Sequence, residues 1–215
     1  MASIGKIARR SFLIGSAAIA GGVAFGVYKI NQTPENPLTA DAGETVLNPY
    51  VIIDQNGVTI ITPRAEMGQG VHTTLAALVA EELDVDMADI RTLHGPPAQA
   101  YFNQAVLGAA LPGKEYAKSD FMHGVARAVG KAGKLLSLQI TGGSTSIVDG
   151  YEKMRAAGAS AREALKQAAA NRSGVAMSRL KTGQGHVILP DGTRISYVDL
   201  AAEAAGVSPT QVPLR

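Results

Sequence analysis

The stretch Glu66-Met67-Gly68-Gln69-Gly70-Val71-His72-Thr73 separates two segments of different periodicity. Residues 58–62 before it are rich in β-branched side chains and predict a strand. Residues 71–84 after it carry apolar side chains at helical spacing and predict an amphipathic helix. Two glycines at such a junction let the backbone turn sharply, and the first turn of a helix offers free N–H groups to an anion. The order strand, glycine-rich turn, helix therefore predicts a phosphate-binding turn at Gly68, Gln69 and Gly70.

The composition excludes several kinds of site. The 215-residue chain has a net charge of +2 and 5% aromatic residues, which argues against nucleic acid as a partner. It has no cysteine, so it forms no disulfide and supplies no thiolate to zinc or to an iron–sulfur cluster. The four histidines, at positions 72, 94, 123 and 186, lie far apart and lack the spacing of metal ligands. The sequence predicts no metal-ligating residues.

The first 48 residues read as a targeting segment. Arg9 and Arg10 precede an apolar run with no charged residue from 11 to 28, which is the pattern of a twin-arginine export signal. We predict a membrane-spanning helix over residues 1–30 with its start in the cytoplasm, followed by a linker over residues 31–48. An uncleaved anchor is the favoured interpretation, and a signal removed near Ala40-Asp41-Ala42 is the alternative. Both place the protein on the periplasmic side of the bacterial inner membrane.

Residues 49–215 are expected to form one mixed α/β domain of the α+β class. Asn56-Gly57 between two β-rich runs predicts a hairpin, a short strand is expected at residues 90–93, and residues 96–118 read as a loop. Helices are predicted at residues 121–138, 147–157 and 160–171, the last with a capping box of Ser160 and Glu163. A second hairpin over residues 186–196 follows a turn at 183–185, and a helix at 197–205 ends the pattern.

A second glycine-containing turn, Thr141-Gly142-Gly143-Ser144-Thr145-Ser146, directly precedes a predicted helix. Hydroxyl groups and free N–H groups at a helix start suit a phosphate or pyrophosphate. An ordinary Ser/Thr cap of the helix is the alternative. Together the two turns predict that a ligand with two phosphates is held from both sides.

The two motifs in this order resemble the molybdenum hydroxylases, which include xanthine dehydrogenase and the aldehyde oxidoreductases. The likeness covers nearly the whole chain and is strongest to large subunits of the isoquinoline oxidoreductase and membrane-bound aldehyde dehydrogenase type. It implies that Gly68, Gln69 and the adjoining Gly70 contact a pterin cofactor, and that Gly143, Ser144, Thr145 and Ser146 hold its phosphate groups. The implied cofactor is molybdopterin cytosine dinucleotide with molybdenum.

The resemblance further implies hydroxylation of an aldehyde or an N-heterocycle, with water as the oxygen source. Electrons would pass to a two-iron two-sulfur subunit and onward to a cytochrome c subunit. Large subunits of this family are several times longer, and their catalytic glutamate stands in a glycine-rich context near the far end. This chain has no such glutamate: Glu203, its last, lies among alanines, and Glu66 belongs to the first motif. We therefore assign no catalytic residue and expect a second chain to carry the rest of the molybdenum subunit.

Two rival functions and three residues stay open at this stage. A non-catalytic assembly or scaffold subunit with an empty turn is one rival, and a binding module for another phosphorylated ligand is the second. Tyr101 and Asn103 belong either to the active-site wall or to a surface loop, and His72 is expected to be a hydrogen-bonded residue at the helix start.

Overall fold

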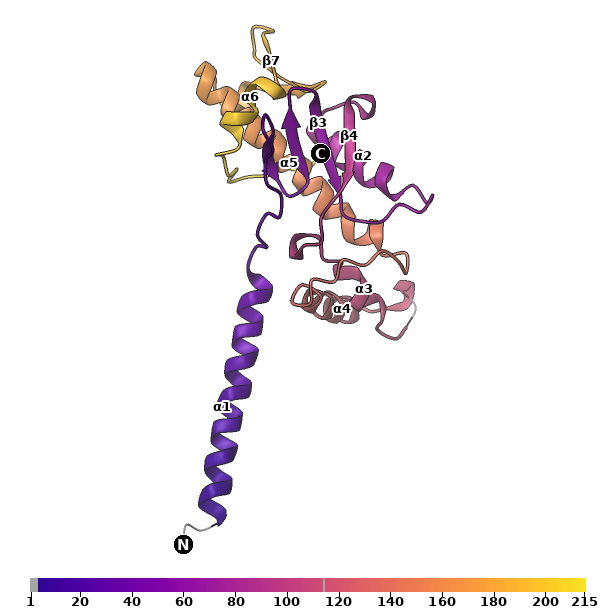
Figure 1. The fold of residues 1–215 in the computed structure, drawn as a ribbon, viewed down its shortest axis with the longest axis vertical. Coiled ribbons are helices and arrows are strands. Elements are labelled where there is room, and N and C mark those ends of the chain that lie inside the picture. Colours follow the sequence, from indigo (N-terminus) through magenta and orange to yellow (C-terminus); the bar gives the residue numbers. More distant parts are fainter. Residues whose placement is uncertain (1–3, 114) are drawn as a thin grey trace.

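A four-stranded sheet forms the centre of the folded body (Figure 1). The computed structural model describes residues 4–113 and 115–215, with the side chains of residues 4–14, 17 and 115 outside the description. The strands β1 (Thr45–Asn48), β2 (Val51–Asp54), β3 (Gly57–Thr62) and β4 (Ile90–His94) lie in chain order across the sheet. The predicted hairpin is confirmed, since β2 and β3 are antiparallel and Asp54 pairs with Gly57. The range expected to be a linker ends in a strand, because β1 pairs with β2 and extends the sheet.

The helix α2 (Val71–Leu83) is the crossover between the parallel strands β3 and β4. A parallel pair needs such a crossover, and the loop from β3 into α2 therefore lies at the carboxyl ends of both strands. Apolar side chains of α2, of the strands and of the helix α5 (Ser146–Ser173) form the hydrophobic core; its largest members include Val51, Ile53, Ile60, Leu75, Leu83, Met154 and Leu165. The mixed α/β class of the prediction is confirmed by this arrangement.

The helix α5 replaces the two helices predicted at residues 147–157 and 160–171. It runs unbroken for 28 residues from Ser146 to Ser173. Gly158 falls between the two predicted helices, but it lies where α5 crosses α2, and a Cβ there would stand 2.5 Å from the carbonyl oxygen of Val79. The predicted capping box is wrong as well: Ser160 is inside the helix, and the Glu163 carboxylate accepts hydrogen bonds from Arg162 and Lys166.

Residues 96–138 contain more helix than the sequence pattern indicated. Short 3-10 turns at Gln99–Tyr101 and Glu115–Ala117 flank the helix α3 (Gln104–Ala109), all within the predicted loop. A further 3-10 turn, Met87–Asp89, directly precedes β4. The helix α4 spans Asp120–Ala132, shorter than the predicted 121–138. A helix as short as α3 spans fewer than two turns, so its apolar residues show no readable period.

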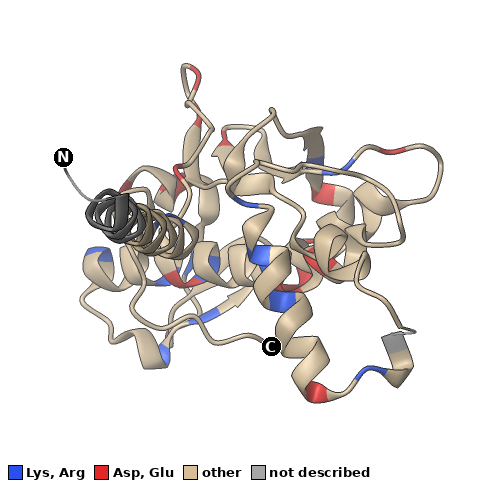
Figure 2. Cartoon of the chain, turned by 90° about the horizontal axis from the view of Figure 1, so that it is seen from below, with Lys and Arg blue, Asp and Glu red and all other residues tan. Residues whose placement is uncertain are grey.

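A three-stranded antiparallel sheet and one helix end the body. After a 3-10 turn at Met177–Arg179, the strands β5 (Lys181–Gly183), β6 (His186–Ile188) and β7 (Arg194–Ser196) lie in chain order, and α6 (Tyr197–Ala204) follows. The predicted hairpin and the predicted turn at residues 183–185 are both confirmed. Acidic and basic residues alternate along the elements of the body (Figure 2).

The N-terminal helix α1 (Ile4–Asn31) projects from the body (Figure 1). No helix in the described part of the chain is long and apolar enough to cross a membrane. The predicted membrane-spanning helix is therefore wrong. A spanning helix needs about 20 mainly apolar residues, whereas the uncharged run in the sequence, residues 11–28, is slightly shorter and includes four glycines. The side chains of Arg9 and Arg10, on which the export prediction rests, lie outside the described residues.

Candidate functional site

The first motif forms an exposed loop between β3 and α2. Gly68 and Gly70 have φ angles of 91° and 74°, the left-handed region that glycine adopts at no steric cost. Gly70 occupies the position that precedes α2, and it has no side chain with which to cap the helix. The sequence therefore folds as predicted here, with a glycine-rich turn that directs the free N–H groups of α2 toward one side.

The carboxylate of Glu66 binds one N–H group in the first turn of α2 and two in the loop before it. Its Oε1 accepts hydrogen bonds from the backbone N–H of Gly68 at 2.8 Å and of Gly70 at 3.0 Å, and its Oε2 accepts one from His72 N–H at 3.0 Å. These hydrogen bonds hold the pKa of Glu66 below its usual range, and the bond from His72 N–H has the largest effect. The place that the sequence assigned to a phosphate is thus filled by an anion of the chain itself.

The Gln69 side chain is also bonded within its own loop. Its Nε2 donates to the carbonyl of Ala65 at 2.8 Å, and its Oε1 accepts from Met67 N–H at 2.5 Å. His72 Nε2 lies 2.7 Å from the carbonyl oxygen of Arg64, and its ring stacks on that of His94 with centroids 5.9 Å apart. The expectation that His72 is a hydrogen-bonded residue at the helix start is confirmed.

The second motif forms the turn that leads into α5, and it lies against the first loop. The Ala65 N–H donates to Thr141 Oγ1 at 2.8 Å, across 76 positions of sequence. Within the turn Gly143 and Ser144 have φ angles of 59° and 56°, which is unusual for a serine. The fold therefore brings the two predicted motifs together. Among the described residues, however, no hydrogen bond joins Gly68 or Gln69 of the first motif to Ser144 of the second.

Thr145 stands at the capping position of α5 but does not cap it. Its Oγ1 donates to the Gly142 carbonyl at 2.7 Å and accepts from Asn103 Nδ2 at 2.8 Å. Among the described residues no side chain caps the first N–H groups of α5. These groups and the positive end of the helix dipole are therefore available to an anion. The alternative of an ordinary Ser/Thr cap does not describe this turn.

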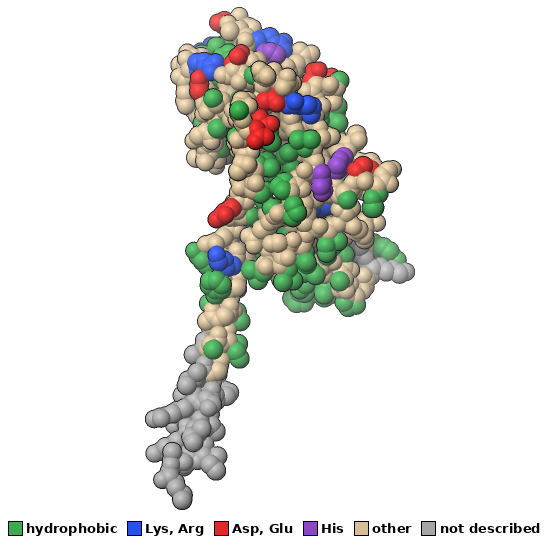
Figure 3. All heavy atoms as spheres, viewed as in Figure 1, with side chains coloured by type: hydrophobic (Ala, Val, Ile, Leu, Met, Phe, Trp, Pro, Cys, Tyr) green, Lys and Arg blue, Asp and Glu red, His purple; other side chains and the backbone are tan. Residues whose placement is uncertain are grey.

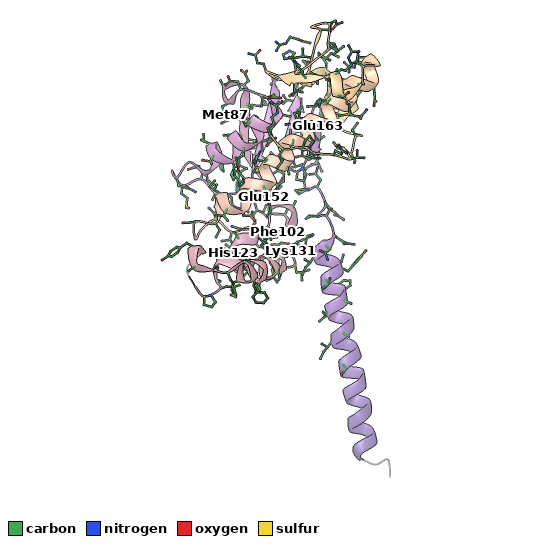
Figure 4. All side chains as sticks on the ribbon, turned by 180° about the vertical axis from the view of Figure 1, so that it is seen from behind. Met87, Phe102, His123, Lys131, Glu152 and Glu163 are labelled. Carbon is green, nitrogen blue, oxygen red and sulfur yellow. The ribbon has the colours of Figure 1, made fainter. Side chains whose placement is uncertain are left out.

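A pocket of about 710 Å³ opens beside this helix start. Gly143, Ser144 and Thr145 line it from the turn, together with residues of α3, α4 and α5 that include His123, Arg127 and Lys153. Figure 4 labels His123 on α4 and Glu152 on α5, which approach the pocket from two sides. Gly68, Gln69, Gly70 and Ser146 do not line it. Both basic and acidic side chains line the pocket, and the basic ones lie beside an uncapped helix start, which suits a phosphorylated group.

A buried ion-pair network supports the pocket floor, and the sequence pattern did not indicate it. Arg64, 1% exposed, donates from Nη2 to Asp149 Oδ2 at 2.5 Å and from Nη1 to the Tyr101 carbonyl at 2.8 Å. Lys153 Nζ donates to Asp149 Oδ1 at 2.7 Å and to the Phe102 carbonyl at 2.7 Å. Burial lowers the pKa of Lys153, while the nearby Asp149 opposes that change. The spacing of Asp149 and Lys153 on one helical side was the available signal.

Tyr101 and Asn103 are neither surface-loop nor pocket-wall residues. Both are fully buried. The Tyr101 hydroxyl donates to the Pro49 carbonyl at 2.5 Å, and the ring packs edge-to-face against Tyr50. Asn103 Oδ1 accepts from Ala105 and Val106 N–H at the start of α3. Among the described residues there is also no cluster of three or more His, Asp or Glu side chains that could hold a metal ion.

Comparison with known proteins extends this description. Residues 8–106, which include the first motif but not the second, match the family of the molybdopterin cofactor-binding domain. The chain is 30% identical over 184 residues to the isoquinoline 1-oxidoreductase subunit beta of Brevundimonas diminuta, covering 85% of this chain and 20% of that protein. It is 25% identical over 203 residues to a membrane-bound aldehyde dehydrogenase [pyrroloquinoline-quinone] of Gluconacetobacter polyoxogenes, covering 92% of this chain and 21% of that protein.

Among solved structures, quinoline 2-oxidoreductase from Pseudomonas putida 86 aligns with 76% of this chain and 17% of its own, at 20% identity and a TM-score of 0.35. That score is too low to establish a shared arrangement. The chain spans about a fifth of the length of the curated relatives that it matches. From the matched cofactor-binding domain and these two relatives, we conclude that the chain belongs to the molybdenum hydroxylase family.

Proposed function

We propose that this chain is the cofactor-binding part of a molybdenum hydroxylase that oxidises aldehydes or N-heterocycles with water as the oxygen source. The observation that carries the proposal is the match to a molybdopterin cofactor-binding domain in a chain whose α5 starts, uncapped, at a pocket with basic side chains on its wall. Each turnover would convert a C–H bond to C–OH and release two electrons and two protons. The bound cofactor would supply the metal centre for this oxidation.

The residues of the second turn fit the phosphate end of such a cofactor. Gly143 and Ser144 line the pocket, and the N–H groups at the start of α5 lack a side-chain cap. We propose that Gly143, Ser144, Thr145 and Ser146 hold these phosphates and that the cofactor is the cytosine dinucleotide form. Thr145 would contribute by holding the turn in shape, because its hydroxyl is bonded to Gly142 and Asn103 and its N–H donates to the Gly142 carbonyl at 3.2 Å.

Contact of the first loop with the pterin is proposed for Gly68, Gln69 and Gly70. These residues are exposed or half-buried and lie outside the pocket. Gln69 would exchange its hydrogen bonds to Ala65 and Met67 for bonds to the ligand. Such an exchange leaves the number of hydrogen bonds nearly unchanged and is therefore inexpensive.

We propose that a second chain supplies the rest of the molybdenum subunit, and that the electrons pass to a two-iron two-sulfur subunit and then to a cytochrome c subunit. The isoquinoline relative is named as a subunit, which supports partner chains. This chain covers about a fifth of each curated relative, so the rest of such a subunit would come from sequence outside these 215 residues. Purification of the native complex, elemental analysis for molybdenum and identification of the co-purifying chains by mass test this proposal. Release of cytidine monophosphate on acid treatment would identify the dinucleotide form. Absence of both the metal and a larger partner would reject the proposal.

Replacement of Ser144 and Ser146 by alanine tests the phosphate contacts. We expect the double variant to retain less molybdenum and less cofactor per complex, because each lost hydrogen bond to a charged group is worth about 1.5–3 kcal/mol. Ser178→Ala, an exposed serine at the other end of α5, is the matched control and should leave the cofactor content unchanged. Unchanged cofactor content in the double variant would show that these hydroxyls do not bind it.

A non-catalytic scaffold subunit is the second candidate, and one observation favours it. The Glu66 carboxylate binds the N–H groups of Gly68, Gly70 and His72, so an anion of the chain already lies where the sequence predicted a phosphate. A complex that contains the larger partner but no molybdenum in this chain's pocket would support the scaffold.

For the location of the complex we propose the periplasm, on the basis of the Arg9-Arg10 pattern. Fractionation of cells that express the full chain, with Arg9→Lys and Arg10→Lys together as the comparison, tests it. Recovery of the unaltered chain with cytoplasmic marker proteins would reject a periplasmic location.

A further inference from the structure

Lys153 lines the pocket from α5, and its ammonium group is held in one position. Its Nζ donates to Asp149 Oδ1 at 2.7 Å and to the Phe102 carbonyl oxygen at 2.7 Å. The same Nζ lies 4.1 Å from the centre of the Phe102 ring, in a cation–π contact. An ammonium group has three N–H donors, and acceptors among the described residues use two of them. The side chain is 26% exposed, so the third donor is available to a ligand in the pocket.

The ammonium group of Lys153 lies beside the first turn of α5, although the residue itself is two turns into the helix. A helical side chain runs back toward the N-terminus and covers the preceding turn. Asp149, which Lys153 contacts, belongs to the first turn of α5. Gly143, Ser144 and Thr145 line the pocket from the turn just before it. The fold therefore brings a cation and the N–H groups of a helix start to the same end of α5.

The buried network behind Lys153 holds more positive than negative charge. Asp149 supplies one carboxylate: its Oδ2 accepts from Arg64, and its Oδ1 accepts from Lys153 and from the Gln104 N–H at 2.7 Å. Two cations thus share one buried anion. In addition, Arg64 Nε is buried without an acceptor among the described residues. Buried charges are normally paired, so this network is short of negative charge, which an anion beside Lys153 would supply.

The pocket wall has the same excess of positive charge. Three basic side chains line it against two acidic ones, namely Lys118, Arg127 and Lys153 against Asp149 and Glu152. Glu152 is exposed, so solvent and salt weaken its effect on a ligand. The charge of Lys153 is mostly shielded from water and acts at a lower effective dielectric constant. In the upper part of the body in Figure 3, by contrast, basic side chains lie beside acidic ones.

We propose that Lys153 is an anion-binding residue of the pocket, and that its third N–H donates to a phosphate oxygen of the bound ligand. Asp149 and Phe102 hold the ammonium group in place before the ligand arrives, so little side-chain entropy is lost on binding. The identity of the ligand rests on the proposed function, whereas the site itself rests on the contacts and the charge balance of Lys153.

Pyrophosphate is the probe, because it carries two phosphates and no other group. Isothermal titration calorimetry at low salt measures its affinity for the full chain. Lys153→Met removes the charge and should weaken pyrophosphate binding by about tenfold or more, as for the loss of a hydrogen bond between charged groups. Lys153→Arg keeps the charge and should bind pyrophosphate more tightly than Lys153→Met does. Lys166→Met, on the same helix, removes a lysine that pairs with Glu163 outside the pocket and should leave the affinity unchanged.

Three results of this titration would overturn the proposal: no binding of pyrophosphate by the unaltered chain, unchanged affinity in Lys153→Met, or an equal loss in Lys166→Met. Circular dichroism checks that the variants are folded. If Lys153→Met does not fold, acetylation of the unaltered chain followed by peptide mass analysis decides. Pyrophosphate should slow acetylation at Lys153 and not at Lys166, and equal acetylation of Lys153 with and without pyrophosphate would overturn the proposal.

The anion site and the proposed function fail by different results. A native complex without molybdenum or a larger partner would reject the proposed function, but pyrophosphate binding that requires Lys153 would still establish the anion site. Molybdenum in the native complex, together with pyrophosphate binding that does not require Lys153, would reject the anion site alone.

Discussion

At the scale of single residues, Glu66 decides how the first motif is built. Its carboxylate accepts three backbone hydrogen bonds at the start of α2, where the glycines leave the N–H groups without another partner. A ligand that approaches this loop meets a negative charge before it meets the helix. This is why we assign the phosphates of the cofactor to the turn at residues 143–146 and not to the first loop.

Glu66→Gln should lower the melting temperature at neutral pH, and the loss should shrink in acid. Hydrogen bonds hold the pKa of Glu66 below its usual value of about 4.3. The stability that these bonds contribute is therefore present above the unfolded-state pKa and is lost as the pH falls through the lower folded-state pKa. Thermal unfolding followed by circular dichroism between neutral pH and about pH 3 measures the difference. Glu35→Gln, at an exposed position, is the control. A pH-independent difference between Glu66→Gln and the unaltered chain would contradict this explanation.

At the scale of elements, the contact between α2 and α5 holds the site together. α2 fixes the first loop at one end of the sheet, and α5 begins at the second turn. The two helices approach closely at Gly158, because a Cβ atom added to this residue would lie 2.5 Å from the carbonyl oxygen of Val79. The relative position of the two motifs therefore depends on this glycine.

Gly158→Ala should destabilise the protein by about 1–2 kcal/mol. Alanine favours a helix over glycine by about 1 kcal/mol, but a methyl group against a backbone oxygen costs about 1–3 kcal/mol or more because neither helix can move cheaply. Urea unfolding measures the net change. Gly206→Ala has no atom within 4 Å of the new methyl group and should be neutral or slightly stabilising. Equal stability of the two variants would show that the helices relax without cost.

At the scale of the whole molecule, α1 is nearly separate from the body. Among the described residues, the hydrophobic core and the side chains packed on it begin at Leu38. The hydrogen bonds from Lys134 join the body to the last turn of α1. The body should therefore fold, and its pocket should form, when most of α1 is removed.

Removal of residues 1–28 should change the free energy of unfolding of the body by no more than about 0.5 kcal/mol, as for surface changes away from the core. The urea midpoint and slope of the shortened and full chains provide the measurement. A lower midpoint with an unchanged slope would mean that α1 stabilises the body.

The sequence could predict the elements whose signals are local. The Asn56-Gly57 hairpin, α2 and the second hairpin depend on turn chemistry and on apolar spacing within a few residues, and each is present. The sequence also placed the two motifs at the starts of α2 and α5. The sequence did not predict α3, because a helix of fewer than two turns shows no readable period. It did not predict an unbroken α5 either, because a glycine inside a helix, here Gly158 in its contact with α2, resembles the glycine that often ends one.

By itself, then, the sequence determined the class of fold, the two glycine-containing turns and, through its motifs, the family. The tertiary structure decided that Glu66 fills the first turn, that Thr145 leaves α5 uncapped, and that Arg64, Asp149 and Lys153 meet beneath the pocket. These contacts join residues as many as 85 positions apart. Local propensity does not encode such contacts, because they form only when the packing of α2, α5 and the sheet brings the side chains together.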